Sequence, residues 1–221
     1  MKINYKLQVI SVFVWWACCI VPVNAQTGKP RRFAFKLGIN GSFVHYQDVA
    51  FYKAPNTPLS RESGTFSIVP DIAGALSGDV VKTNKIDLVL GVGARGRGFA
   101  SKYQKGSQQK WFSVYGDLAL KIKPSPKYYF MPGIRVDYNN ASRDREVFPL
   151  IFGVFRPRQY EYSPFISAGK NFRLLNRSFF AELEYNHGIS NVLKEDVNHY
   201  SVDYDANMKS RTLTLSVGIR F

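Results

Sequence analysis

Apolar and polar side chains alternate with a two-residue period along most of the chain, and this pattern constrains the fold more than any other feature. It is clearest at the C-terminus, where every second residue is apolar: Leu213, Leu215, Val217, Ile219 and Phe221. Successive side chains of a β-strand point to opposite faces, whereas a helix repeats about every 3.6 residues. No sustained helical period follows residue 26. The sequence therefore predicts an all-β protein.

Eight segments share this alternation and are bounded by clusters of glycine, proline, asparagine and aspartate. They cover residues 33–40, 67–77, 86–95, 112–122, 128–139, 160–171, 179–189 and 212–221. The phase is weaker in 67–77, and in 160–171 it is blurred where Phe165 stands beside Ile166. Strands of roughly 10 residues have the length that crosses a bilayer at the tilt of a barrel.

The connections between these segments alternate in length along the chain. Residues 46–64, 98–110, 140–159 and 190–211 form long connections, and residues 78–84, 124–127 and 172–177 form short ones. Outer-membrane barrels show this asymmetry, with short periplasmic turns and long outer loops. We therefore expect an eight-stranded antiparallel up-and-down transmembrane β-barrel in a bacterial outer membrane, with both termini periplasmic.

The N-terminal segment has the pattern of an export signal. Lys2 and Lys6 are followed by an apolar run over residues 7–23 and by Ala25. We expect cleavage of a signal peptide, residues 1–25, which leaves residues 26–221 as one barrel domain. A membrane anchor and a lipoprotein acylated at Cys18 are the alternatives. Both cysteines, Cys18 and Cys19, precede the cleavage site, so the expected mature protein has no thiol chemistry.

The chain is strongly basic, with a formal net charge of +14 at pH 7. The signal peptide holds two of the lysines and no acidic residue, so the expected mature protein carries +12. Such a charge attracts polyanions. Because an exported protein rarely meets nucleic acid, we expect a lipid or saccharide surface instead.

A soluble β-sandwich or a lipocalin-like barrel would also show alternation. Two features favour the membrane barrel. The polar face is rich in small residues yet includes opposite charges, which suits a narrow filled lumen. Aromatic residues also lie near strand ends, as in interfacial girdles: Phe33, Phe112, Tyr128, Tyr138, Phe179 and Phe221.

The interior of an eight-stranded barrel is just wide enough for side chains to fill, which argues against an open pore. The charged residues predicted to point inward are Lys36, Asp71, Asp87, Arg95, Asp117, Lys121, Arg135, Asp137, Glu182, Glu184 and Arg220. Their near balance predicts a salt-bridge network that plugs the barrel. Proton relay or ion passage is the alternative.

One long connection and the strand end before it are cationic and aromatic. They carry Arg95, Arg97, Lys102, Lys105 and Lys110, interleaved with Phe99, Tyr103 and Trp111. The pattern indicates a candidate anionic-ligand loop for lipid phosphates or acidic glycans. The alternative is a solvated loop that contacts lipopolysaccharide without specificity.

A histidine and a serine near the end of the seventh segment invite comparison with outer-membrane lipid A deacylases. Those enzymes place the two residues two positions apart, whereas His187 and Ser190 are three apart and would face opposite sides of a strand. His45 and His199 have no spacing typical of a metal site. We therefore predict no catalytic residues, no metal and no cofactor.

Three stretches resemble the PorT-like outer-membrane β-barrel domain family. They are FKLGINGSF at residues 35–43, EYNHGISNV at 184–192 and RTLTLSVGIRF at 211–221. The resemblance implies a porin-like barrel without a known reaction, and the namesake of the family assists secretion of surface proteins. The terminal Phe221 also resembles the signal that the barrel-assembly machinery recognises.

These observations lead to one expected function with two alternatives. We expect an integral outer-membrane barrel without enzymatic activity, acting in envelope structure, surface binding or secretion assistance. Its expected partners are outer-membrane lipid and lipopolysaccharide, the barrel-assembly machinery, and a secretion or surface protein. The alternatives are a lipid-modifying enzyme and a narrow channel.

Overall fold

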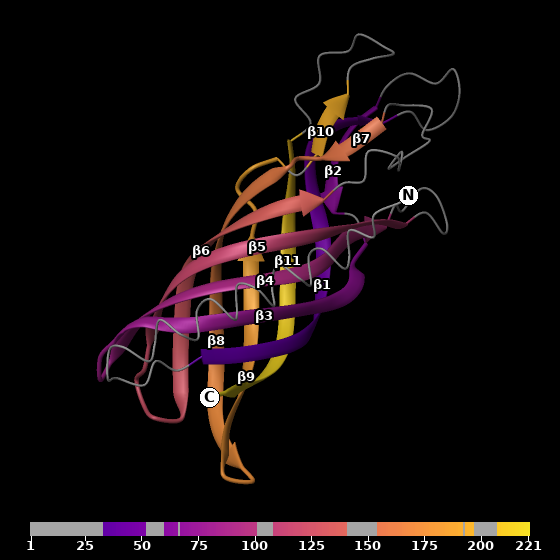
Figure 1. Ribbon diagram of the computed structural model, residues 1–221. Coiled ribbons are helices and arrows are strands. Elements are labelled where there is room, and N and C mark those ends of the chain that lie inside the picture. Colours follow the sequence, from indigo (N-terminus) through magenta and orange to yellow (C-terminus); the bar gives the residue numbers. More distant parts are fainter. Residues whose placement is uncertain are drawn as a thin grey trace, which may run out of the picture. The chain divides into compact units, whose positions relative to one another are not determined.

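Eight antiparallel strands close into a barrel in the computed structural model (Figure 1). The strands are β1 (Phe33–Phe51), β3 (Val69–Lys82), β4 (Ile86–Ala100), β5 (Gln108–Ile122), β6 (Tyr128–Asn140), β8 (Tyr160–Leu174), β9 (Arg177–His187) and β11 (Asn207–Arg220). Each pairs with its neighbour in this order, and β11 returns to pair with β1 from Ala34↔Arg220 to Gln47↔Asn207. The predicted fold class is confirmed.

The structure describes residues 33–51, 60–65, 67–100, 108–140, 154–191, 193–196 and 207–221. The predicted signal peptide, residues 1–25, lies outside this part of the chain. The described residues contain no helix that is long and apolar enough to cross a membrane.

Three short strands that the sequence pattern did not indicate lie in the long connections. They are β2 (Ser60–Thr65), β7 (Val154–Pro157) and β10 (Leu193–Asp196). β2 continues the sheet beside the end of β1, and β7 pairs with β10 in a separate two-stranded sheet. These three strands lie at one end of the barrel, here called the long-loop end (Figure 1).

The opposite end, here called the short-turn end, carries short turns as predicted, and the first and third are tighter than predicted because the strands beside them continue further. Residues 83–85 and 123–127 form two of them. The third consists of Leu175 and Asn176, whose φ angles of 49° and 60° are both positive. A two-residue hairpin with this backbone matches the right-handed twist of the strands that it joins.

The apolar face of each strand points outward. Leu37 is 58% exposed and Ile72 is 73% exposed, whereas Thr212 on the inner face is fully buried. The blurred phase of the strand after Tyr160 is resolved, since Phe165 points inward and Ile166 outward. A soluble barrel would bury its apolar face, so this wall has the distribution that a lipid environment requires.

Four aromatic rings in the lumen lie over glycines of the neighbouring strand. The register pairs Tyr115 with Gly93, Tyr129 with Gly169, Phe165 with Gly133 and Phe180 with Gly218. A Cβ atom added to any of these glycines would overlap the opposite ring. Glycine therefore makes room for large rings inside a narrow barrel.

This packing predicts different effects for two glycine-to-alanine changes. We expect Gly169→Ala to lower the free energy of unfolding by about 1–3 kcal/mol, because its methyl group would displace the Tyr129 ring. Gly116→Ala is the matched control, since its methyl group would meet nothing closer than the Gly91 carbonyl oxygen at 4.0 Å. Urea unfolding of the refolded barrel, followed by circular dichroism, measures both. Equal stability of the two variants would contradict the prediction.

Candidate functional site

The middle of the lumen holds a cluster of ion pairs around Arg135. Its guanidinium donates to Asp117 at 2.8 Å and to both carboxylate oxygens of Glu184. Lys36 then bridges Glu184 at 3.3 Å and Glu182 at 2.6 Å. These five side chains come from β1, β5, β6 and β9, so the cluster links strands across the barrel.

A second cluster lies nearer the long-loop end. Both Arg95 and Arg97 are buried, and each makes a two-pronged ion pair. Arg95 Nη2 is 2.8 Å from both oxygens of Asp137, while Arg97 lies 2.7 Å and 3.0 Å from the oxygens of Glu161. The Ser210 hydroxyl bonds to both members of the second pair. Such paired hydrogen bonds are the geometry in which a buried arginine is best satisfied.

Aromatic rings complete the environment of the arginines. The Arg135 guanidinium carbon lies 3.9 Å from the centroid of the Tyr115 ring and 4.7 Å from that of Phe165. Arg97 lies 5.8 Å from the centroid of Trp111. Ring faces attract a cation and exclude water, so they support the charges without providing a counter-ion.

The two clusters form what we call the lumen network, and apolar layers lie on both sides of it. The network comprises Lys36, Arg95, Arg97, Asp117, Arg135, Asp137, Glu161, Glu182 and Glu184. Towards the long-loop end the buried apolar residues are Val44, Tyr46, Val69, Phe99, Trp111 and Met208. Towards the short-turn end they are Val89, Ala119, Tyr129, Met131, Phe165 and Phe180.

Little empty space remains within the network. A cavity of about 10 Å³ lies between Lys36, Arg95, Tyr115, Arg135 and Glu184. This volume holds about one water molecule. The described lumen is therefore a packed interior of paired charges, as predicted.

The structure corrects the predicted cationic loop in two positions. Arg95 and Arg97 do not belong to an exposed rim, because β4 continues through both and turns their side chains into the lumen. Lys110 is exposed on β5, and Lys102 and Lys105 lie outside the described residues. Anion binding by this loop therefore remains a prediction that rests on the lysines.

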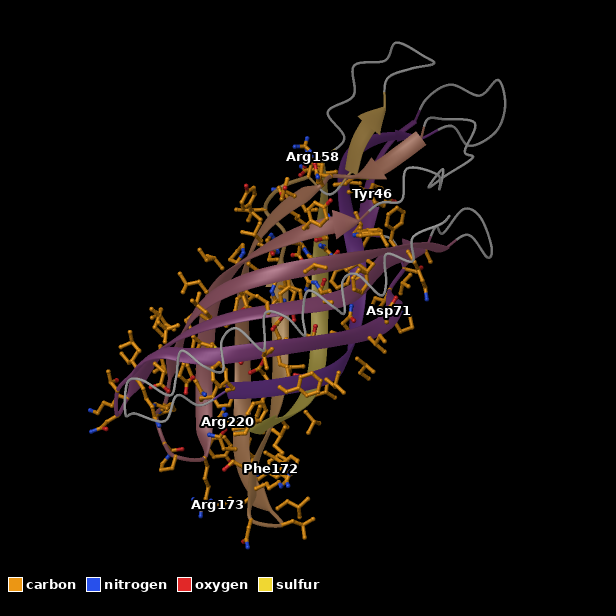
Figure 2. The ribbon with its side chains drawn as sticks, in the orientation of Figure 1. Tyr46, Asp71, Arg158, Phe172, Arg173 and Arg220 are labelled. Atoms are coloured by element: carbon orange, nitrogen blue, oxygen red, sulfur yellow. The ribbon has the colours of Figure 1, made fainter. Side chains whose placement is uncertain are left out.

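Most of the predicted inward charges have partners in the lumen or at its ends. Asp87 pairs with Lys123 at 2.7 Å, and Asp71 accepts a backbone N–H from Ile72. Sequence reasoning missed Glu161, although its place between the outward Tyr160 and Tyr162 would have indicated it. Lys121 and Arg220 also point inward, and Figure 2 shows Arg220 towards the short-turn end.

The histidine and serine near the end of β9 have separate partners. His187 Nδ1 is 3.2 Å from the Tyr185 hydroxyl, and the Ser190 hydroxyl accepts the backbone N–H of Tyr162 at 3.1 Å. Within the described part of the chain, no hydrogen bond joins His187 to Ser190, and no cluster of side chains suited to a metal ion is present.

The buried pair of Arg97 and Glu161 gives a prediction for stability. We expect Glu161→Gln to lower the free energy of unfolding by about 3–5 kcal/mol, because it leaves the buried guanidinium with only Asp137, at 3.8 Å and already bound to Arg95, as a counter-charge. The double variant Arg97→Met with Glu161→Met should recover much of this loss. A double-mutant cycle from urea unfolding measures the coupling, with the exposed Lys110→Met as control. Additive effects would contradict the pairing.

Comparison with known proteins defines what the chain is similar to. No protein family and no curated protein matches its sequence. Among solved structures it is similar to Neisserial surface protein A, with a TM-score of 0.45 and 11% identity over 87% of this chain and 100% of the other. It is also similar to the outer membrane protein OprG of Pseudomonas aeruginosa (TM-score 0.44, 12% identity, 87% and 97% of the two chains).

A third similar structure is that of Ail, the attachment invasion locus protein of Yersinia pestis, in complex with the heparin analogue sucrose octasulfate. Its TM-score is 0.38, with 14% identity over 87% of this chain and 100% of Ail. These likenesses concern the fold alone. The resemblance to the PorT-like family stays a prediction from three short stretches of sequence.

Proposed function

We propose that this protein is an integral outer-membrane β-barrel that acts without enzymatic activity, by binding at its ends and outer wall. The packed lumen is the observation that carries the proposal. Paired charges fill its centre, and apolar residues such as Phe99 and Phe180 lie on both sides of them. A barrel filled in this way supports the surfaces at its ends instead of conducting solutes.

The outer wall supports the membrane location. Large apolar side chains such as Leu37, Ile134 and Leu215 are more than half exposed around the barrel. A surface of this kind requires lipid, and lipopolysaccharide is the corresponding partner in an outer membrane. In this proposal both termini are periplasmic, and the C-terminal Phe221 is the residue that the barrel-assembly machinery recognises.

The long-loop end is the proposed surface for an outside partner. There β1 extends to Phe51 and pairs with β2, and β7 pairs with β10. Strand extensions beyond the barrel wall provide backbone hydrogen-bonding groups with which a partner can pair. Assistance to secretion, as in the PorT-like family, is one form that this binding takes in our proposal.

The membrane location predicts the behaviour of the purified protein. We expect the folded barrel to require detergent, and to migrate apart from the boiled protein in an electrophoretic gel, because the closed sheet resists detergent unfolding. A soluble periplasmic protein expressed from the same vector is the control. A monomer that stays soluble without detergent would contradict the membrane location.

The packed lumen predicts the absence of stable ion conductance. We expect planar bilayers that contain the purified barrel to show no long-lived conductance steps, because passage would require breaking the ion pairs of Arg97 and Arg135. A wide porin recorded under the same conditions is the control. Regular single-channel steps would instead support the narrow-channel alternative.

Lipid chemistry provides the test of the non-enzymatic proposal. We expect no change in the mass of lipid A when the protein is expressed, because His187 and Ser190 bond to different partners. Mass spectrometry of extracted lipid A measures this. A mass shift that is abolished by His187→Ala or Ser190→Ala would overturn the proposal.

A further inference from the structure

Two cations inside the short-turn end lack the counter-charges that the rest of the lumen provides. Lys121 on β5 is 6% exposed, and Arg220 on β11 is partly buried. Both stand beside the ring of Tyr129, with the Lys121 nitrogen 5.0 Å and the Arg220 guanidinium carbon 5.3 Å from its centroid. Neither makes an ion pair with a carboxylate of the described residues.

The nearby carboxylates are already engaged by other groups. Asp87 accepts from the Lys123 ammonium at 2.7 Å and from the Thr83 backbone at 3.1 Å. Glu182 accepts from Lys36 at 2.6 Å and from the Tyr129 hydroxyl at 2.6 Å. Asp79, which also belongs to this end, forms no ion pair with either cation.

Two neighbouring cations beside one ring are unfavourable without an anion. Removing a charge from water costs more than the attraction of a ring face returns. The Lys121 nitrogen makes no hydrogen bond with the described residues. It is nevertheless not one of the polar atoms that are fully enclosed without a partner. This nitrogen therefore still reaches solvent. Neither cation is therefore closed off from an anion in solvent.

The surrounding rim attracts anions to the same place. The exposed or partly exposed cations of the short-turn end are Lys82, Lys85, Lys123, Lys127, Lys170, Arg173 and Arg177. Figure 2 shows Arg173 and Arg220 towards the same end of the barrel. The acidic side chains of the described short-turn end are Asp79 and Asp87, and Asp87 is buried. One sign of charge around an opening raises the local concentration of the opposite ion.

We propose that Lys121 and Arg220 form a binding site for a phosphate group at the short-turn end of the lumen. Arg220 is the more exposed of the two and receives the phosphate oxygens on its planar set of N–H donors. Lys121 provides the second positive charge from the inner side. The phosphate belongs either to a phospholipid headgroup or to a soluble molecule, and the lipid source rests on the proposed membrane location.

Titration of the detergent-solubilised full barrel with inorganic phosphate tests this site. The buffer is free of phosphate, and chloride keeps the ionic strength constant. We expect saturable binding, followed by ³¹P resonance broadening, that weakens about tenfold or more in Lys121→Met and in Arg220→Gln. Lys127→Met is the matched control, because this lysine is exposed on the rim, and its affinity should stay within about twofold.

The stability of the same variants without phosphate provides a second readout. We expect Lys121→Met to be at least as stable as the original protein, because it replaces an unpaired buried cation by an apolar side chain of similar length. Loss of stability in this buffer would show that Lys121 is paired within the barrel and would overturn the proposal. Absent saturation, or equal weakening in all three variants, would overturn it too.

Reconstitution in lipid distinguishes the two sources of phosphate. If a headgroup occupies the site, nanodiscs that contain phosphatidylglycerol should suppress binding of inorganic phosphate. If the ligand is soluble, binding should persist in these nanodiscs. Either result supports the site. Failure of the proposed function would be a separate result, because the conductance and lipid A measurements detect it independently of phosphate binding.

Discussion

The narrow bore of an eight-stranded barrel determines the rest of this structure. Closure of β1 onto β11 leaves an interior that side chains must fill, and half of every strand points into it. Large rings fit because a glycine such as Gly169 faces them from the next strand. Charges fit because each network arginine has a carboxylate within hydrogen-bonding distance. The packed interior thus accommodates its large rings and pairs its buried charges at the same time.

Much of the fold could be predicted from alternation alone, because the side-chain period of a strand is fixed by its backbone. The number of barrel strands, their order and the outward apolar face follow from it. The extent of the strands does not. Arg97 lies between Gly96 and Gly98 near the end of β4, where no large apolar side chain marks the outer face, and the pairing with β5 as far as Ala100 shows that the strand continues. The pairing of Arg97 with Glu161 likewise follows only from the three-dimensional arrangement.

The two ends of the barrel differ in a way that bears on function. The long-loop end carries additional strand pairs, and buried aromatic residues such as Trp111 lie in the lumen towards this end. The short-turn end carries exposed cations around the partly buried Arg220. Alternation identified both Lys121 and Arg220 as inward charges, but it could not show that Asp87, opposite Lys121 in the register, binds Lys123 instead. In the proposed membrane location, such a molecule would present different chemistry to the two sides of the membrane.

The ion pairs of the lumen join parts of the chain that are far apart in sequence. Lys36 and Glu182 are separated by 146 residues, and Arg97 and Ser210 by 113. Pairing of the first and last strands is what brings the earliest and latest of these groups together. Until that step an open sheet would carry lysine, arginine and glutamate on one face and leucine and isoleucine on the other. In the proposed membrane location the charged face would need water while the apolar face contacts lipid, so barrel assembly would have to shield the two faces differently until β1 pairs with β11.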